Sequence, residues 1–172
     1  MIYKSKHIKR VIRMLFKRKA DQKRHFERNA FCSHISDIFR HPAVRRMRQY
    51  PHHGRTNCYD HCLHVAFYNY KWCRRLHLDY RSAARAGMLH DMFLYDWHTH
   101  GRLTGERLHG LTHPKRALKN AGKYFSLNPT EKDVILSHMW PVTFFRFPCT
   151  KEGWIIVLTD KYCGLLETLR LL

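Results

Sequence analysis

Histidine and aspartate side chains recur in apolar segments of this chain, where their polar groups need partners. GMLHDMF at residues 87–93 is the clearest example, because an imidazole and a carboxylate follow one another between apolar residues. The residues of this kind are His61, His90, Asp91, His113, His138 and Asp160. Successive members are 29, 1, 22, 25 and 22 residues apart. Apart from the adjacent pair His90 and Asp91, each interval is roughly one helix plus one loop. That spacing would let each helix of a bundle bring one ligand, or one pair of ligands, to a shared centre.

Two arrangements could satisfy these buried polar groups. Burying an unpaired charge is costly, and adjacent helical residues point about 100° apart, so His90 and Asp91 do not simply pair with each other. The alternatives are a hydrogen-bonded core and a metal ion, and imidazole with carboxylate suits divalent iron, manganese or zinc. Four other histidines are expected to be solvated surface residues, namely His52, His53, His77 and His100.

Helices are the elements that must position these residues. Apolar periodicity and capping residues predict helices over residues 59–76, 81–95, 114–125, 129–140 and 151–172, with Ser82 as a possible N-cap and residues 98–112 as a loop. There are no β-hairpin turn signals and no internal repeats. The sequence therefore predicts an all-α fold.

Charge divides the chain into two parts. The formal net charge is +19 over 172 residues, and residues 1–50 hold 15 Lys and Arg against 3 Asp and Glu. The stretch PHHGRTN at residues 51–57 has turn-forming composition, so we expect a basic helical segment over residues 1–50 and the main domain over residues 51–172.

The basic segment has an amphipathic pattern near its start. Its apolar stripe could dock on the main domain, lie on an anionic membrane, or accompany contacts of the basic face with nucleic acid or another polyanion. The stripe consists of Ile8, Val11, Ile12, Leu15 and Phe16. These three alternatives remain open from composition alone.

Cysteine use and hydropathy indicate a cytoplasmic protein. None of the six cysteines forms a CxxC pair, which disfavours zinc-ribbon and thioredoxin sites and favours reduced thiols. The first residues do not form a signal peptide, and no apolar run is long enough to span a bilayer.

Three motifs in order resemble the HD-domain metal-dependent phosphohydrolases, whose pattern is H…HD…D on an all-α helical bundle. They are DHCLHVA at residues 60–66, GMLHDMF at 87–93 and LTDKYCGLLE at 158–167, and the resemblance covers about residues 58–168. HGLTHPKRA at 109–117 and ILSHMWP at 135–141 resemble the additional histidine segments of a two-metal subgroup. There is no GYP motif, which disfavours hydrolysis of cyclic di-GMP.

The resemblance implies two divalent ions, of iron, manganese or zinc. Asp91 would bridge them and be the central catalytic residue, with His61, His90 and Asp160 on one ion and His113 and His138 on the other. His64 and His109 are rival ligands.

The resemblance also implies an activity: hydrolysis of a phosphoester or phosphoanhydride, expected to be that of a nucleotide, by metal-activated hydroxide. Lys161, Arg107 and His109 are the candidates for holding the substrate phosphates. The alternative is a non-catalytic regulatory or binding module of the same fold, whose basic N-terminal segment binds a polyanion.

Overall fold

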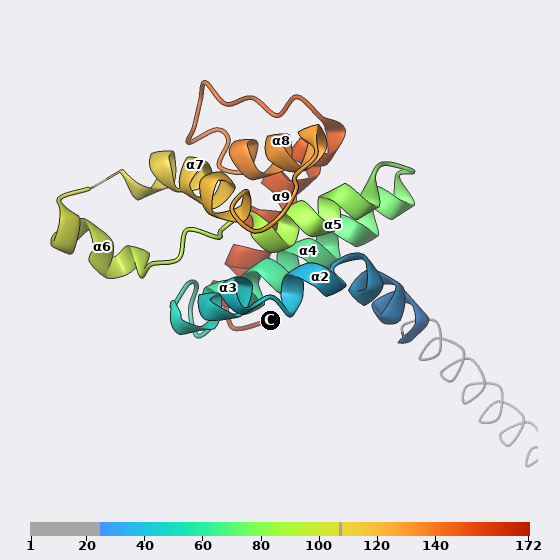
Figure 1. The fold of residues 1–172 in the computed structure, drawn as a ribbon, viewed down its shortest axis with the longest axis horizontal. Coiled ribbons are helices and arrows are strands. Elements are labelled where there is room, and N and C mark those ends of the chain that lie inside the picture. The colour runs from blue at the N-terminus through green and yellow to red at the C-terminus, as the bar shows by residue number, and fades with distance from the viewer. Residues whose placement is uncertain (1–24, 107) are drawn as a thin grey trace, which may run out of the picture. The chain divides into compact units, whose positions relative to one another are not determined.

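The computed structural model describes residues 25–106 and 108–172, and its described part is all-α, as predicted (Figure 1). The helices are α2 (Ser36–Phe39), α3 (Pro42–Arg45), the 3-10 helix η1 (Arg46–Gln49), α4 (Cys58–Arg75), α5 (Tyr80–Leu89), α6 (Trp97–Thr104), α7 (His109–Ala121), α8 (Pro129–Ser137) and α9 (Lys151–Thr168).

The chain divides into two compact units, Met1–Ser33 and His34–Leu172. In the first unit, the described residues 25–33 are helical. The predicted apolar stripe from Ile8 to Phe16 lies outside the described residues. The predicted domain boundary between residues 50 and 51 stays a prediction.

Four helices form the centre of the second unit. α4 packs on α5 and α9, and α8 packs on α5 and α9, as Figure 1 shows. α4 and α5 approach closely at Gly87, because a Cβ atom there would lie only 2.8 Å from the Cα of Ala66. The core is therefore built from small residues where these two helices cross.

Local capping explains where several helices begin. The side chain of Asn57 accepts a hydrogen bond from the backbone N–H of Asp60 at the start of α4. Asn128 and Glu131 form a capping box at the start of α8, where a helix beginning at Pro129 was predicted. The predicted N-cap at Ser82 is wrong: Asp79 caps α5 and accepts from the N–H of Ser82.

Two predicted boundaries near the histidines are also wrong. α5 ends at Leu89 rather than at residue 95, so His90 is its C-cap and Asp91 lies in the following turn. The predicted loop over residues 98–112 contains α6 and the start of α7. α6 forms because Asp96 caps its first turn and Gly105, at φ 76°, ends it in the left-handed conformation.

Within the described residues, the helices are too short or too polar to cross a lipid bilayer.

Candidate metal centre

The six residues singled out from the sequence come together at one place in the second unit. They come from five helices or helix ends: α4, the end of α5, which provides two of them, α7, the end of α8 and α9. The residues are His61, His90, Asp91, His113, His138 and Asp160, hereafter the His/Asp cluster. All except Asp160 are buried, and the side chain of Asp160 is 13% exposed.

Asp91 lies at the centre of the His/Asp cluster, and its two carboxylate oxygens face different histidines. Oδ1 is 3.1 Å from Nε2 of His113 and 3.4 Å from Nε2 of His138. Oδ2 is 3.4 Å from Nε2 of His90 and 4.0 Å from Nε2 of His61. This carboxylate could therefore contribute one oxygen to each of two ions.

Asp160 completes the side of the cluster that Oδ2 of Asp91 faces. Its Oδ1 is 3.1 Å from Nε2 of His61 and 3.6 Å from Nε2 of His90. Three groups of ligand atoms in the described part of the chain are compact enough to hold an ion, each with its atoms within 4.8 Å of one another. One of them is His52, His53 and His61, beside the cluster, and the other two belong to the cluster. The two groups within the cluster are His61, His90 and Asp160, and His90, Asp91 and His138. The buried cluster could thus hold a metal ion.

Helix ends orient the histidine rings. His90 and His138 are the C-caps of α5 and α8, and their Nδ1–H groups donate to the carbonyls of Gly87 and Ile135, at 2.8 Å each. Carbonyls in a last helical turn have no intrahelical partner, so a ring N–H can satisfy them. In a neutral ring this bond leaves the Nε2 lone pair free and turned into the cluster.

His113 has the same arrangement on α7. Its Nδ1–H donates to the carbonyl of His109 at 2.9 Å, and its Nε2 lies 2.8 Å from Nε2 of His138. Two neutral imidazoles oriented in this way would direct lone pairs at each other, which is unfavourable unless a proton or cation lies between them. Among the described residues, Nε2 of His90 and Oδ1 of Asp91 are also buried and find no hydrogen-bond partner. These donor atoms fit divalent cations.

The two aspartates remain ionised. Burial by itself would raise the pKa of Asp91 and of Asp160, but the neighbouring histidines outweigh burial and hold each pKa well below its ordinary value. Both carboxylates of the cluster are therefore anionic.

Glu167 supports the cluster and was missed from the sequence. Its two carboxylate oxygens accept from Nδ1 of His61 and Nδ1 of His64, at 2.8 Å each. Burial would raise the pKa of Glu167, but these two hydrogen bonds lower it to about 2. A signal was available, because Glu167 follows Asp160 by seven residues and so lies on the same face of α9.

This contact separates His61 from its rival His64. Nε2 of His61 faces Asp160, whereas Nδ1 of His64 faces Glu167 and its side chain is 33% exposed. His64 therefore lies behind the cluster, on the far side of Glu167.

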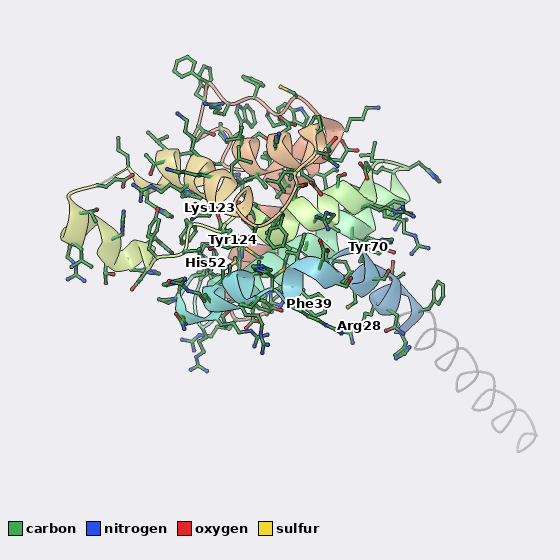
Figure 2. All side chains as sticks on the ribbon, viewed as in Figure 1. Arg28, Phe39, His52, Tyr70, Lys123 and Tyr124 are labelled. Carbon is green, nitrogen blue, oxygen red and sulfur yellow. The ribbon has the colours of Figure 1, made fainter. Side chains whose placement is uncertain are left out.

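His52 contradicts the prediction of a solvated surface residue. Its side chain is 7% exposed, and its Nε2 is 3.2 Å from Oδ2 of Asp91 (Figure 2 labels the residue). The turn at residues 51–57 brings it there, because the N–H of His52 donates to the carbonyl of Thr56 and Gly54 adopts a φ of 57°. Burial, and then His61, lower the pKa of His52 to about 4. His53 follows it, and its ring meets that of His61 edge-on, with the ring centres 5.2 Å apart.

A cavity of about 850 Å³ opens onto the cluster. Asp91, His113, His138 and Asp160 line its inner part, and α6 and the start of α7 line the remainder with Trp97, Arg102, Glu106 and His109 among others. His52 and His53 also line it. Such a volume is in the usual range for small-molecule sites.

The three residues predicted to hold phosphate have different positions. His109 lies in the cavity wall with its ring stacked on that of His113, and burial, followed by His113, lowers its pKa to about 4. It is thus a neutral hydrogen-bonding group. Lys161 donates from Nζ to the carbonyl of His138 at 3.3 Å, and burial lowers its pKa. Arg107 lies outside the described residues.

No protein-family model, curated protein or solved structure matches this chain.

Metal binding is expected to stabilise this protein more strongly as the pH rises. Burial would lower the pKa of His61, but hydrogen bonds with Asp160 and Glu167 raise it from 6.5 to about 10. His61 is therefore protonated in the metal-free protein at neutral pH, and its Nε2 must lose a proton to bind an ion. Affinity should rise by up to about tenfold per pH unit for each proton released.

The measurement is the rise in melting temperature on adding Mn²⁺ to protein first treated with a chelator, between about pH 5.5 and about pH 8. We expect the rise to grow steadily over this interval. A rise independent of pH, or one that shrinks as pH increases, would contradict His61 as a ligand.

Proposed function

We propose that this protein is an HD-domain type phosphohydrolase that requires two divalent metal ions and cleaves a phosphoester or phosphoanhydride bond, in a nucleotide by preference. The observation that carries the proposal is Asp91, whose two oxygens face separate groups of histidines. The order of the motifs along the chain supports the same family.

Each ion would have its own set of ligands. His61, His90, Asp160 and Oδ2 of Asp91 would hold one, and His113, His138 and Oδ1 of Asp91 would hold the other. When bound, such ions supply a water molecule of lowered pKa and neutralise negative charge on phosphoryl oxygens.

The protein's own residues would orient these ligands and the substrate. Glu167 fixes the ring of His61 through Nδ1, and backbone carbonyls fix those of His90, His113 and His138. His52, 3.2 Å from Asp91, lines the cavity and can donate or accept a hydrogen bond close to the reacting phosphate.

The outer part of the cavity has groups that suit a nucleotide. Trp97 lines the cavity with its ring stacked on that of His109, and its buried Nε1 finds no hydrogen-bond partner among the described residues. Arg102 is an exposed cation on the same wall and could pair with phosphate. We propose these two residues as the base and phosphate contacts.

The test is a screen of nucleoside mono-, di- and triphosphates and dinucleoside polyphosphates for phosphate or nucleotide release. The protein would be stripped with a chelator and reloaded with Mn²⁺, Fe²⁺ or Zn²⁺. We expect metal-dependent release from at least one class. No turnover of any phosphorylated compound by metal-loaded protein would favour a non-catalytic module instead.

His113→Ala is expected to remove one of the two ions and to leave the other bound. It removes one ligand from the pair near Oδ1 of Asp91, while every ligand near Oδ2 remains. Elemental analysis is expected to give about one ion per chain in place of about two, with activity reduced at least about a hundredfold. The control is Thr112→Ala, a neighbouring substitution on α7 that should leave both ions. Two retained ions in His113→Ala would remove His113 from the ligand set.

A further inference from the structure

The connection between α8 and α9 exposes an unusual number of large apolar side chains. Phe145 is 96% exposed, and Val142, Phe144 and Phe147 are each more than half exposed. Figure 2 shows side chains projecting outward along this connection, at the top of the view. The stretch reads PVTFFRFP at residues 141–148. Single exposed apolar residues are ordinary, but several together mark an interaction surface.

These side chains form one continuous surface with the start of α9. The rings of Phe144 and Phe145 are 5.6 Å apart, those of Phe144 and Phe147 are 6.4 Å apart, and those of Phe147 and Trp154 are 6.1 Å apart. Trp154 is itself 39% exposed. We define the aromatic patch as Val142, Phe144, Phe145, Phe147 and Trp154.

The exposed charges that adjoin the aromatic patch in the sequence are positive, and the nearby half-buried Asp133 is held by hydrogen bonds from Cys149 and Thr150. Residues 134–151 contain no Asp or Glu, while Arg146 and Lys151 are exposed beside the rings. The acidic residues of α9 are directed inward instead. Glu152 accepts from the N–H of Asp79, and Asp160 and Glu167 bind histidines of the cluster.

We propose that the aromatic patch inserts into the interfacial layer of an anionic membrane, with Arg146 and Lys151 at the lipid phosphates. Aromatic rings beside cations are the combination that binds such interfaces, through apolar burial together with attraction to anionic lipid. The net charge of +19 adds long-range attraction to the same surface. A second copy of the chain is a poorer occupant, because it would bring the same cations against each other.

The patch adjoins the cavity of the candidate metal centre. Met139 lines that cavity, and a Cβ atom on Gly110, which also lines it, would lie 3.6 Å from Val142. Membrane docking would therefore hold the cavity beside the lipid headgroups. The docking itself does not depend on the proposed hydrolase activity.

The test is sedimentation of the full chain with vesicles of phosphatidylcholine, alone or mixed with phosphatidylglycerol. The parent should bind the mixed vesicles, and Phe144→Ser/Phe145→Ser should bind them at least about tenfold more weakly. The control variant is Tyr124→Ser, which alters another half-exposed aromatic residue on the connection between α7 and α8 (Figure 2). It should bind as the parent does.

Metal content and melting temperature of the double variant should match those of the parent, because both rings are largely exposed. Equal binding by the double variant and the parent would overturn the proposal and place the contact elsewhere, as in the basic residues 1–50. Failure of the parent to bind mixed vesicles would overturn it too. So would parent dimers in analytical ultracentrifugation that the double variant does not form, because the patch would then join two copies.

Discussion

Asp91→Asn is expected to remove both metal ions from the protein. The amide keeps the size of the carboxylate but loses its charge, and one of its two terminal atoms becomes an NH₂ group that cannot be a ligand. Since each oxygen of Asp91 faces a different group of histidines, the substitution affects both ions. Metal-dependent activity should fall by about a thousandfold or more.

Elemental analysis of the variant, after incubation with Mn²⁺ and desalting, measures the first effect. The matched control is Asp60→Asn, which alters the residue directly before His61 in the sequence. Asp60 pairs with the side chain of Asn57 and not with the cluster, so this control should keep its metal. Metal content in Asp91→Asn equal to that of Asp60→Asn would contradict the central role of Asp91.

Glu167→Gln is expected to have the largest effect on stability. The carboxylate is buried and binds two histidines, and removing one partner of a buried charge pair costs about 3–5 kcal/mol. For a chain of this size, that corresponds to a fall in melting temperature on the order of 10 °C. Because His61 also loses the group that orients its ring, metal affinity should fall by about 10- to 100-fold.

The pH dependence of this effect has a defined sign in the metal-free protein. The pKa of Glu167 is lowered from 4.5 to about 2, so its contribution is complete above pH 4.5 and is lost as pH falls toward 2. The pKa of His61 is raised from 6.5 to about 10, so its contribution is complete below pH 6.5 and is lost as pH rises toward 10. The difference between parent and Glu167→Gln should therefore be largest between these limits, at pH 4.5 to 6.5.

Thermal unfolding of chelator-treated parent and variant across this pH range is the measurement. Asp37→Asn is the control, because Asp37 is exposed and its partner Arg85 keeps a second carboxylate, Glu131. It should unfold close to the parent temperature. If Glu167→Gln does the same, the carboxylate does not hold His61 as the geometry indicates.

Local signals predicted most of the fold. Helices α4, α8 and α9 begin within one residue of the predicted positions. Their N-caps are Asn57, Asn128 and Thr150, and each of these side chains accepts a hydrogen bond from the backbone N–H three residues later, so the signal is local in the sequence. α6 was missed because its glycine, threonine and histidines suggest a loop, and only the pairing of an Asp cap with a left-handed glycine reveals it.

Some residues of the candidate site could be predicted from the sequence and others could not, for a physical reason. His61, His90, Asp91, His113, His138 and Asp160 could be chosen because each is a polar residue in an apolar segment. His52 has no such context: it lies in a polar turn and reaches Asp91 only through tertiary packing. Glu167 contacts His61 across 106 residues, and nothing local fixes that partner.

The two-ion centre is measured by the metal content of the full chain, purified without added metal and with no affinity tag. We expect about two ions of iron, manganese or zinc per chain by elemental analysis, or two after reconstitution. One ion would contradict the two-ion centre and leave His113 and His138 as cavity-lining residues. No ion, even after reconstitution, would contradict the metal centre itself and make the cluster a hydrogen-bonded histidine core.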